Sequence, residues 1–395
     1  MNRMPLSAED REKIISLRKE LHQFPELAHT ESTTKQILLK YLKDYGLKVT
    51  EVPNSSGFFA DLVMFPGKNF VALRADMDGL PVEEENDIEF KSRNHGKMHA
   101  CGHDGHMSIA FGTFLYLQKS KSLNKNLRLI FQPAEEEASV GGARELISAG
   151  ALEKVDFIAG MHMWPEILEG KVGYRKGPFF SGLNKFKIII KGDGTHAARP
   201  DLAGPNTIYV SNTLLTAITG FLQRTAYPWA PYTLNINKLE GSPKETTIWG
   251  IISHSVAPDE SELPIQPGRR YEDLKTDLIE ICTKTGESMG AEVGVTIQEG
   301  YPPLVTDVSA TELAIEVIQE VLGKDAPIES SMTFGGEDFS LYLDKVQGTY
   351  LLLGVYNRKD GFTGMIHTPR FNFSDSVLIK GSTLMAELML RASEL

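Results

Sequence analysis

The sequence predicts an α/β fold with a mostly parallel sheet, into which a second domain of ferredoxin-like (βαββαβ) order is inserted. Short apolar runs typical of buried strands alternate with helical patterns, as expected when helices join parallel strands. The runs are residues 71–73, 127–131, 157–159 and 350–353, and the helical patterns are residues 109–118 and 142–148. The order of elements changes near residue 184, and the parallel pattern resumes near residue 301.

The first part of the chain carries the signals of two helices. Ser7 and Asp10 resemble a capping box, in which a short side chain satisfies free backbone N–H groups at a helix start. Apolar residues at helical spacing follow until Pro25 ends the run; they are Ile14, Ile15, Leu17 and Leu21. A second helix is predicted over residues 32–45, and Gly46 stands where a left-handed C-cap is needed.

The inserted segment has the order strand, helix, strand, strand, helix, strand, which is the split βαβ pattern. Its predicted strands are residues 186–190, 233–239, 246–252 and 292–298, and its predicted helices are residues 206–223 and 271–288. The flanking linkers contain Gly177, Pro178 and Gly182 on one side and Gly300, Pro302 and Pro303 on the other. We therefore expect one domain from residues 1–181 and 301–395, and an inserted domain from residues 182–300.

Composition excludes several functional classes. Of the 395 residues, 41% are hydrophobic and 24% are charged, which is typical of a globular protein. The net charge of -11 argues against a nucleic-acid partner. No apolar run approaches the ~18 residues of a membrane span, and residues 1–19 are too charged for a secretory signal. Cys101 and Cys282 provide no disulfide framework, so we expect a cytoplasmic protein.

Polar residues cluster where the predicted strands end. The residues that follow strands are Asp76, Asp78, Glu135, Glu136, Glu137, His162 and, one loop later, His367. Residues 99–106, which include Cys101 and His103, directly precede a predicted helix. Sites in open α/β sheets lie beyond the carboxyl ends of the strands, so we expect these segments to converge in one crevice. Thiolate, imidazole and carboxylate together are the ligand set of zinc or a neighbouring divalent metal.

Each of these residues also has an ordinary structural interpretation. A single cysteine is usually a small core residue, and Cys282, on an apolar helix face, fits that interpretation. A single histidine such as His162 is more often a hydrogen-bonded core residue than a ligand. Three consecutive glutamates usually lie in solvent, but here they directly follow a buried strand and Pro133. Their shared position at strand ends is what favours a metal site.

Four runs closely resemble the motifs of the M20 metallopeptidase family, within the amidohydrolase branch of aminoacylase-like, hippurate and auxin-conjugate hydrolases. They are residues 72–81 (ALRADMDGLP), 98–104 (MHACGHD), 131–136 (FQPAEE) and 160–162 (GMH). Residues 335–339 (GGEDF) and 367–369 (HTP) resemble later motifs of the family. The resemblance covers almost the whole chain. It implies a catalytic metal-binding domain and an inserted lid and dimerisation domain.

The resemblance implies two divalent metal ions per subunit. Cys101 would bridge them, His103 and His162 would complete one ion, and Glu136 and His367 the other. Thiolate and imidazole favour zinc, although manganese, cobalt or nickel would also fit.

The resemblance also assigns catalytic and supporting residues. Glu135 would be the general base beside the dinuclear centre, while Glu137 would be a bystander in solvent. Asp78 and Asp104 are expected to accept hydrogen bonds that orient histidine ligands. Residues 191–200 (KGDGTHAARP) resemble the segment whose histidine reaches the active site of a partner subunit. His196 would there stabilise the oxyanion, which implies a homodimer formed through the lid domain.

The chain departs from the family pattern in the inserted domain. Residues 240–250 (EGSPKETTIWG) replace a longer segment whose asparagine and arginine would hold a substrate carboxylate. Thr195 stands for the usual glycine before the histidine, and Asp201 for a common histidine. Either Lys244 with Thr246 and Thr247 anchors the carboxylate, or the substrate lacks one, or Arg199 supplies the anchor. Substrate-binding residues therefore stay undetermined at this point.

The resemblance predicts a hydrolase that cleaves the amide bond of N-acyl amino acids or similar small amides through a dinuclear metal-activated water. One alternative is a metallo-carboxypeptidase or dipeptidase, because it would use the same metal ligands. Another is a catalytically inactive binding protein of the same fold. The last alternative predicts the loss of Glu135 or a ligand, and none of these six positions is altered.

Overall fold

A computed structural model of the chain divides into two compact units. The structure describes residues 6–120, 122–137, 141–194, 196, 198–199, 202–225, 232–255 and 271–395. The first unit contains Met1–Phe179, Val305–Ser331 and Asp338–Leu395, and the second contains Phe180–Leu304 and Met332–Glu337. We expected residues 332–337 in the first domain, whereas in the structure they group with the second unit. No helix in the described part of the chain is both long and apolar enough to cross a membrane.

The first unit is built on an eight-stranded sheet with the order β1-β2-β4-β3-β5-β14-β6-β13. Its strands are β1 (Lys48–Glu51), β2 (Phe58–Leu62), β3 (Phe70–Asp76), β4 (Asn126–Gln132), β5 (Val155–Leu168), β6 (Val172–Tyr174), β13 (Pro327–Glu329) and β14 (Gly348–Tyr356). The four central strands β4, β3, β5 and β14 are parallel, which confirms the mostly parallel sheet predicted from the sequence.

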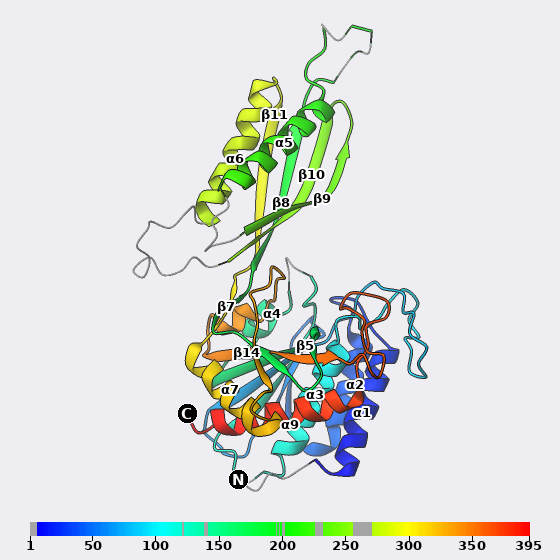
Figure 1. Ribbon diagram of the computed structural model, residues 1–395, viewed down its shortest axis with the longest axis vertical. Helices are drawn as coiled ribbons and strands as arrows, with labels where there is room; N and C mark the ends of the chain where they lie inside the picture. Colours follow the sequence, from blue (N-terminus) through cyan, green and yellow to red (C-terminus); the bar gives the residue numbers. More distant parts are fainter. Residues whose placement is uncertain are drawn as a thin grey trace. The chain divides into compact units, whose positions relative to one another are not determined.

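Helices cover both faces of this sheet (Figure 1). The helices are α1 (Ala8–Gln23), α2 (Ser32–Leu42), α3 (His103–Leu117), α4 (Ala143–Ser148), α7 (Val308–Leu322), α8 (Ser340–Leu343) and α9 (Asp375–Ala392), with a 3₁₀ turn, η1, at Lys43–Tyr45. The Ser7 capping box is present, and Gly46 is left-handed after η1, as the sequence predicts. The predicted second helix ends its α-helical part three residues early, because η1 forms its last turn.

Helix α3 is the central helix of the first unit, and every one of its residues is buried. It is packed so closely against α9 that a Cβ at Gly112 would lie 2.1 Å from Ser382 Oγ. A helix that is apolar on all sides belongs in the core rather than at the surface. The buried position of α3 holds the loop before it, which contains Cys101, inside the protein.

The second unit has the topology that its sequence pattern predicts. Its elements are β8 (Gly182–Lys191), α5 (Thr207–Thr225), β9 (Tyr232–Gly241), β10 (Glu245–His254), α6 (Tyr271–Ser288) and β11 (Glu292–Tyr301). The antiparallel sheet has the order β11-β8-β10-β9, and α5 and α6 pack on one face around an apolar core that includes Cys282. The chain passes between the units at β7 (Gly177–Phe180), at β12 (Leu304–Thr306), and on both sides of residues 332–337.

Candidate metal centre

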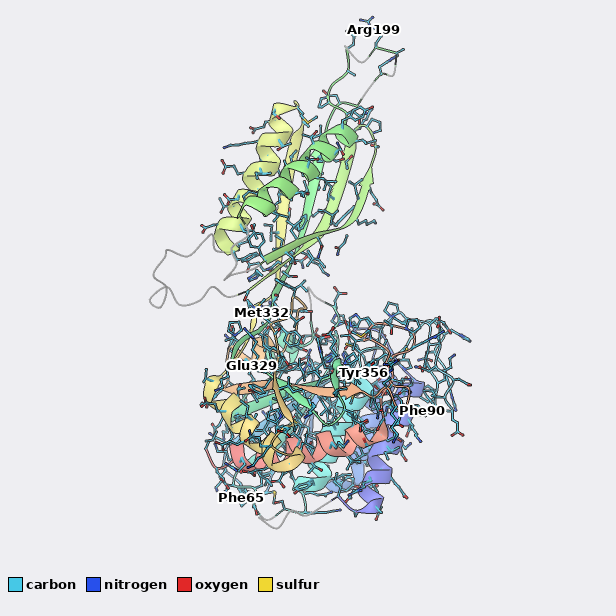
Figure 2. The ribbon with its side chains drawn as sticks, in the orientation of Figure 1. Phe65, Phe90, Arg199, Glu329, Met332 and Tyr356 are labelled. Atoms are coloured by element: carbon cyan, nitrogen blue, oxygen red, sulfur yellow. The ribbon has the colours of Figure 1, made fainter. Side chains whose placement is uncertain are left out.

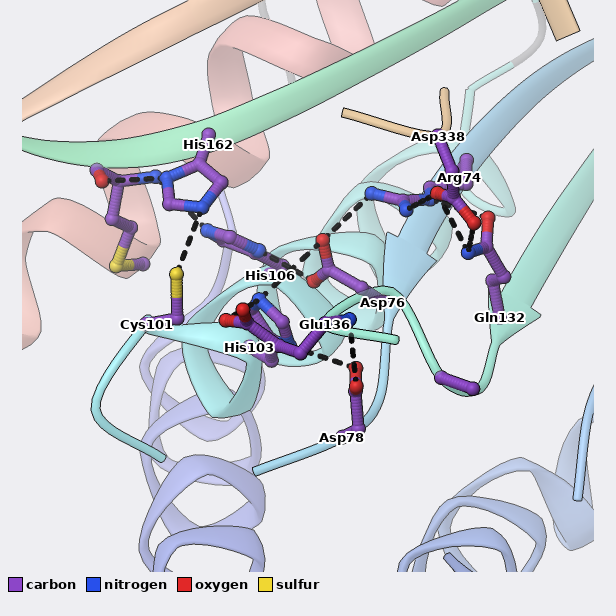
Figure 3. A network of polar contacts seen from close by, with 12 residues as sticks. Arg74, Asp76, Asp78, Cys101, His103, His106, Gln132, Glu136, His162 and Asp338 are labelled. Carbon is purple, nitrogen blue, oxygen red and sulfur yellow. Dashed lines mark hydrogen bonds and ion pairs between the residues drawn. The ribbon is translucent and has the colours of Figure 1, made fainter. Parts of the chain in front are cut away.

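Five side chains predicted from the sequence come together at the carboxyl ends of the central strands. In one group, ligand atoms of Cys101, His103 and His162 lie within 4.8 Å of one another; Cys101, Glu136 and His367 form a second such group. Because Cys101 belongs to both groups, its thiol stands where a bridging ligand would be needed. Figure 3 shows Cys101 facing His162, with His103 and Glu136 beside them.

The distances within these groups are short. Cys101 Sγ lies 3.2 Å from His162 Nε2 and 3.3 Å from His367 Nε2. His367 Nε2 also lies 3.2 Å from Glu136 Oε1. The His367 backbone has a positive φ of 61°, and its N–H donates to the Ala100 carbonyl at 2.8 Å. That bond fastens the loop after β14 directly beside the loop that carries Cys101.

In the two buried candidate ligands His103 and His162, the Nδ1 ring nitrogen is held by an acceptor. His103 Nδ1 lies 3.2 Å from Asp78 Oδ1, and His162 Nδ1 lies 2.8 Å from the Met163 carbonyl oxygen. A nitrogen that donates to oxygen leaves the opposite Nε2 to face the cysteine, which is the usual arrangement for a metal-binding histidine. Both histidines therefore present Nε2 to the same place.

His103 Nε2 shows that these residues fit a metal ion. This buried nitrogen has no hydrogen-bond partner among the described residues, and the nearest carboxylate oxygens, of Asp76 and Glu136, are 3.8 and 3.9 Å away. Burial lowers the pKa of His103, but the nearby Asp76 and Asp78 outweigh it and raise that pKa to about 10. A positive charge is therefore favoured at this nitrogen, and a divalent cation would supply it.

The electrostatics of the Cys101 thiol also favour a divalent cation at this place. Burial, together with the charges of Glu136 and Glu135, raises the pKa of Cys101 well above its usual range. Burial and the neighbouring His106 hold the pKa of His162 well below its usual range, so that ring is a neutral donor of a lone pair. A coordinated thiol loses its proton outright, so a divalent cation would stabilise the thiolate beside the two carboxylates.

Glu135 is placed beside the ligands rather than among the cysteine groups. Its carboxylate lies within 4.8 Å of ligand atoms of His103 and Glu136, and the side chain is buried. The preceding residue, Ala134, has a positive φ of 53°. Glu137 is half-buried and belongs to neither of the groups that contain Cys101.

Of the two aspartates predicted to orient histidine ligands, Asp78 contacts one and Asp104 has other partners. Asp78 faces His103 through Oδ1 and accepts from the Glu136 backbone N–H through Oδ2 at 3.0 Å. Asp104 instead lies 2.8 Å from His22 Nδ1 and 3.3 Å from Arg18 Nε. His22 and Arg18 both belong to α1, and neither is in a candidate ligand group among the described residues. The structure corrects the expected position of Asp104 accordingly.

A layer of charged residues lies behind the candidate ligands. The sequence pattern placed Asp76 at a strand end and His106 in the 99–106 segment, but it predicted neither the contact between them nor the part played by Arg74. Asp76 lies 2.6 Å from His106 Nδ1 and accepts from Arg74 at 2.6 Å, while His106 Nε2 accepts from the Met163 N–H at 2.9 Å. Figure 3 shows this chain of contacts, with Arg74 continuing to Asp338 at 2.8 Å. The available signal was polar residues within an otherwise apolar buried strand, as in residues 72–78.

His196 lies in the second unit and is exposed. Its Nδ1 accepts from the Ala198 N–H at 3.3 Å, and nearby Arg199 lies at the end of that unit (Figure 2). Thr195 and Asp201 are outside the described residues. In the β9–β10 hairpin, Thr246 is buried with its hydroxyl 2.8 Å from that of Thr207.

The fold and the ligand set define a protein with a buried divalent-metal site at the carboxyl ends of parallel strands. Residues 72–391 match the sequence profile of peptidase family M20/M25/M40, and the chain belongs to this family. It is a metal-dependent hydrolase of amide bonds, as the motif resemblance predicted.

Relatives in the family cover nearly the whole chain. The chain is 33% identical to thermostable carboxypeptidase 1 of Saccharolobus solfataricus over 96% of this chain and 95% of that protein. It is 31% identical to N-acetyl-L-cysteine deacetylase of Bacillus subtilis over 95% of this chain and 87% of the relative. The crystal structure of the Bacillus subtilis YXEP protein, a dinuclear metal-binding M20 peptidase, has a TM-score of 0.80 at 26% identity, covering 98% and 99% of the two chains.

We predict that Asp78→Asn weakens metal binding. The variant loses the carboxylate charge opposite His103 and one acceptor for the Glu136 backbone, so metal affinity should fall ~10- to 100-fold. Affinity is measured by competition with a chelator. The matched control is Glu387→Gln, a buried carboxylate that accepts from Tyr116 in the α3–α9 interface, which should leave affinity unchanged. Equal affinities for Asp78→Asn and wild type would contradict this role.

Proposed function

We propose that the protein hydrolyses the amide bond of N-acyl amino acids or similar small amides at the Cys101 centre, with two divalent metal ions. The observation that supports this most directly is the double grouping of ligand atoms around Cys101, with Glu135 beside them. The relatives include a deacetylase of an N-acetyl amino acid, which cleaves a bond of this class.

The ligands are assigned by their two groups. Cys101 would bridge both ions, His103 and His162 would hold one, and Glu136 and His367 the other. A bound divalent ion supplies Lewis-acid chemistry, since it polarises a carbonyl oxygen and lowers the pKa of water towards ~7. Thiolate and imidazole favour zinc, and manganese, cobalt or nickel also suit this donor set. Two buried cysteines without a disulfide support a cytoplasmic location.

The chain's own residues then divide the work. The Glu135 carboxylate takes a proton from the attacking water and delivers it to the amide nitrogen as that nitrogen leaves. Asp78 holds the His103 ring through Nδ1 and the turn of Glu136 through its backbone N–H. His162 is fixed by the Met163 carbonyl. Because these partners are already in place, little reorganisation is needed during the reaction.

A second candidate function is peptide cleavage by a carboxypeptidase or dipeptidase. The 33% identity to thermostable carboxypeptidase 1 supports it, and the same ligands and base would serve it. Carboxypeptidases require recognition of a free carboxylate. In the β9–β10 hairpin, however, Thr246 bonds to Thr207, and the Lys244 stem packs where a Cβ of Gly194 would lie. We therefore favour amides whose binding does not depend on a carboxylate anchored by this hairpin.

A substrate panel tests this choice. Metal-loaded protein should cleave N-acyl amino acids and their carboxamides with similar kcat/KM and should cleave dipeptides more slowly. A tenfold or larger preference for the free acid, which corresponds to ~1.4 kcal/mol, would show that the carboxylate is recognised. Chelation should abolish all of these activities and added divalent metal should restore them. Full activity of the metal-free protein would contradict the proposal.

Substitution of the two adjacent glutamates separates the base from the ligand. Glu135→Gln should retain both metals and lose ~10² to 10⁴ in kcat, which is the usual contribution of a general base. Glu136→Gln should instead lose metal, because it removes a charged ligand atom 3.2 Å from His367. Metal content and single-turnover rates are measured on both variants. If Glu136→Gln keeps both metals and loses only rate, the two roles are exchanged.

We further propose a homodimer formed through the second unit, in which His196 hydrogen-bonds the substrate carbonyl in the partner's site. The exposed position of His196 supports this role. Inactive His196→Ala and inactive Glu135→Gln subunits, mixed and reassembled, should recover up to about a quarter of wild-type activity. Only one of the two sites in each mixed dimer is then complete. A fully active monomer would rule the proposal out.

A further inference from the structure

Glu31 is a buried carboxyl group that the proposed reaction does not use. It is 0% exposed and immediately precedes α2, but it does not cap that helix with its side chain. Its Oε1 accepts two backbone hydrogen bonds, from His29 at 3.0 Å and from Ala134 at 2.8 Å. Its Oε2 has no hydrogen-bond partner among the described residues. A buried charged or polar group in this position requires a specific reason.

Both N–H groups that Glu31 accepts belong to residues in the left-handed region. His29 has a φ of 64° and Ala134 a φ of 53°, and neither is glycine. Such conformations are strained for residues with a Cβ, and they persist only where neighbouring groups hold them. One oxygen of Glu31 therefore holds two strained residues, about 100 positions apart in the chain.

Ala134 immediately precedes the glutamate pair. Ala134 is the second residue after the end of β4, and its backbone direction determines where the chain carries Glu135 and Glu136. The other side of the same turn is held by Asp78, which accepts from the Glu136 N–H at 3.0 Å. The two carboxyls thus hold the turn at both ends. The segment before Glu31 is also attached to the Asp78 loop, because the Gly79 N–H donates to the Glu26 carbonyl at 2.7 Å.

We propose that Glu31 is a positioning residue: by clamping the left-handed Ala134 backbone, its Oε1 sets the separate directions of Glu135 and Glu136. This inference rests on the proposed function of those two glutamates. The role needs an acceptor at Oε1 and does not need a negative charge. Burial, and then the charge of Asp78, raises the pKa of Glu31 to about 7, which agrees with a group that acts as a near-neutral acceptor.

The test compares Glu31→Gln, which keeps the acceptor, with Glu31→Met, which removes it at similar size. Metal affinity is measured by chelator competition, and kcat and KM on the metal-loaded protein. Glu31→Met should lose ~10-fold or more in metal affinity and in kcat, with KM little changed, and Glu31→Gln should restore most of both. The matched control is Glu26→Met, which removes acceptors for the Thr34 N–H and hydroxyl at the start of α2. It should lower only the unfolding temperature.

A second variant connects the effect to Ala134. Glycine adopts a positive φ without the Cβ penalty, so Ala134→Gly should reduce the loss caused by Glu31→Met. If Glu31→Met is insoluble alone, recovery of folded, metal-binding protein in the Ala134→Gly background supports the clamp, and failure to recover overturns it. Glu31→Met with wild-type metal affinity and kcat also overturns it, as does Glu31→Gln with losses equal to those of Glu31→Met.

Unfolding temperatures at several pH values provide a readout independent of catalysis. The folded-state pKa of about 7 lies above the ordinary value of 4.5, so the folded protein binds a proton at Glu31 that the unfolded chain has lost between these two values. The free energy of unfolding therefore falls as the pH rises from about 4.5 to about 7, and this contribution is gone above about pH 7. Asp78 is the charged group that acts on it. Glu31→Gln cannot ionise, so its unfolding temperature should rise relative to wild type between about pH 4.5 and about pH 7, and the difference should stay constant above that range. A difference in unfolding temperature between Glu31→Gln and wild type that does not change with pH would contradict the view of Glu31 as a buried acceptor with little charge. Because metal affinity and stability need no substrate, this inference can fail separately from the proposed reaction.

Discussion

The parallel pairing of the central strands is the constraint on which the site depends. Strand β3 pairs with β4 as far as Asp76 opposite Gln132, but with β5 only as far as Leu73 opposite Ala159. Strand β5 continues beyond that point, with His162 opposite Leu352 of β14. The strand ends therefore leave an opening in which His162 faces the segments that follow β3 and β4. Residues far apart in the chain meet there because parallel strands all end at the same edge.

Buried carboxyl groups then convert this opening into a fixed geometry, because each one holds two separate parts of the chain. Asp78 joins His103 to the Glu136 turn, Asp76 joins Arg74 to His106, and Glu31 joins residue 29 to residue 134. A buried carboxyl with a single weak partner would be costly, since desolvation raises its free energy. Two partners each offset that cost and make the position of the ligands depend on several strands at once.

The candidate ligands could be named from the sequence because strand ends and motif spacing identify them without knowledge of side-chain directions. Only the order of strands and the family motifs were needed to name the five candidates, which are Cys101, His103, Glu136, His162 and His367. The residues behind them could be predicted only with knowledge of the direction in which each side chain points. Asp104 follows His103 directly, yet on a helix neighbouring side chains diverge, and Asp104 turns to His22 of α1. Arg74 is recognisable as a polar residue within a buried strand, but its partner Asp338 is far away in the sequence, and so is Ala134, the partner of Glu31. Likewise, the 332–337 segment joins the second unit through tertiary packing that no local pattern records.

Two of the non-glycine residues with a positive φ lie in turns that carry candidate ligands. Ala134 and His367 are both left-handed without being glycine, a conformation that costs ~1–3 kcal/mol at each residue. Each is held by one hydrogen bond from its own N–H: Ala134 to Glu31, and His367 to the Ala100 carbonyl. A glycine at either position would remove the strain, but it would also widen the range of backbone directions in the unfolded and the folded chain. The restricted alanine and histidine keep Glu136 and His367 within contact distance of Cys101, and the surrounding buried hydrogen bonds offset the strain that this requires.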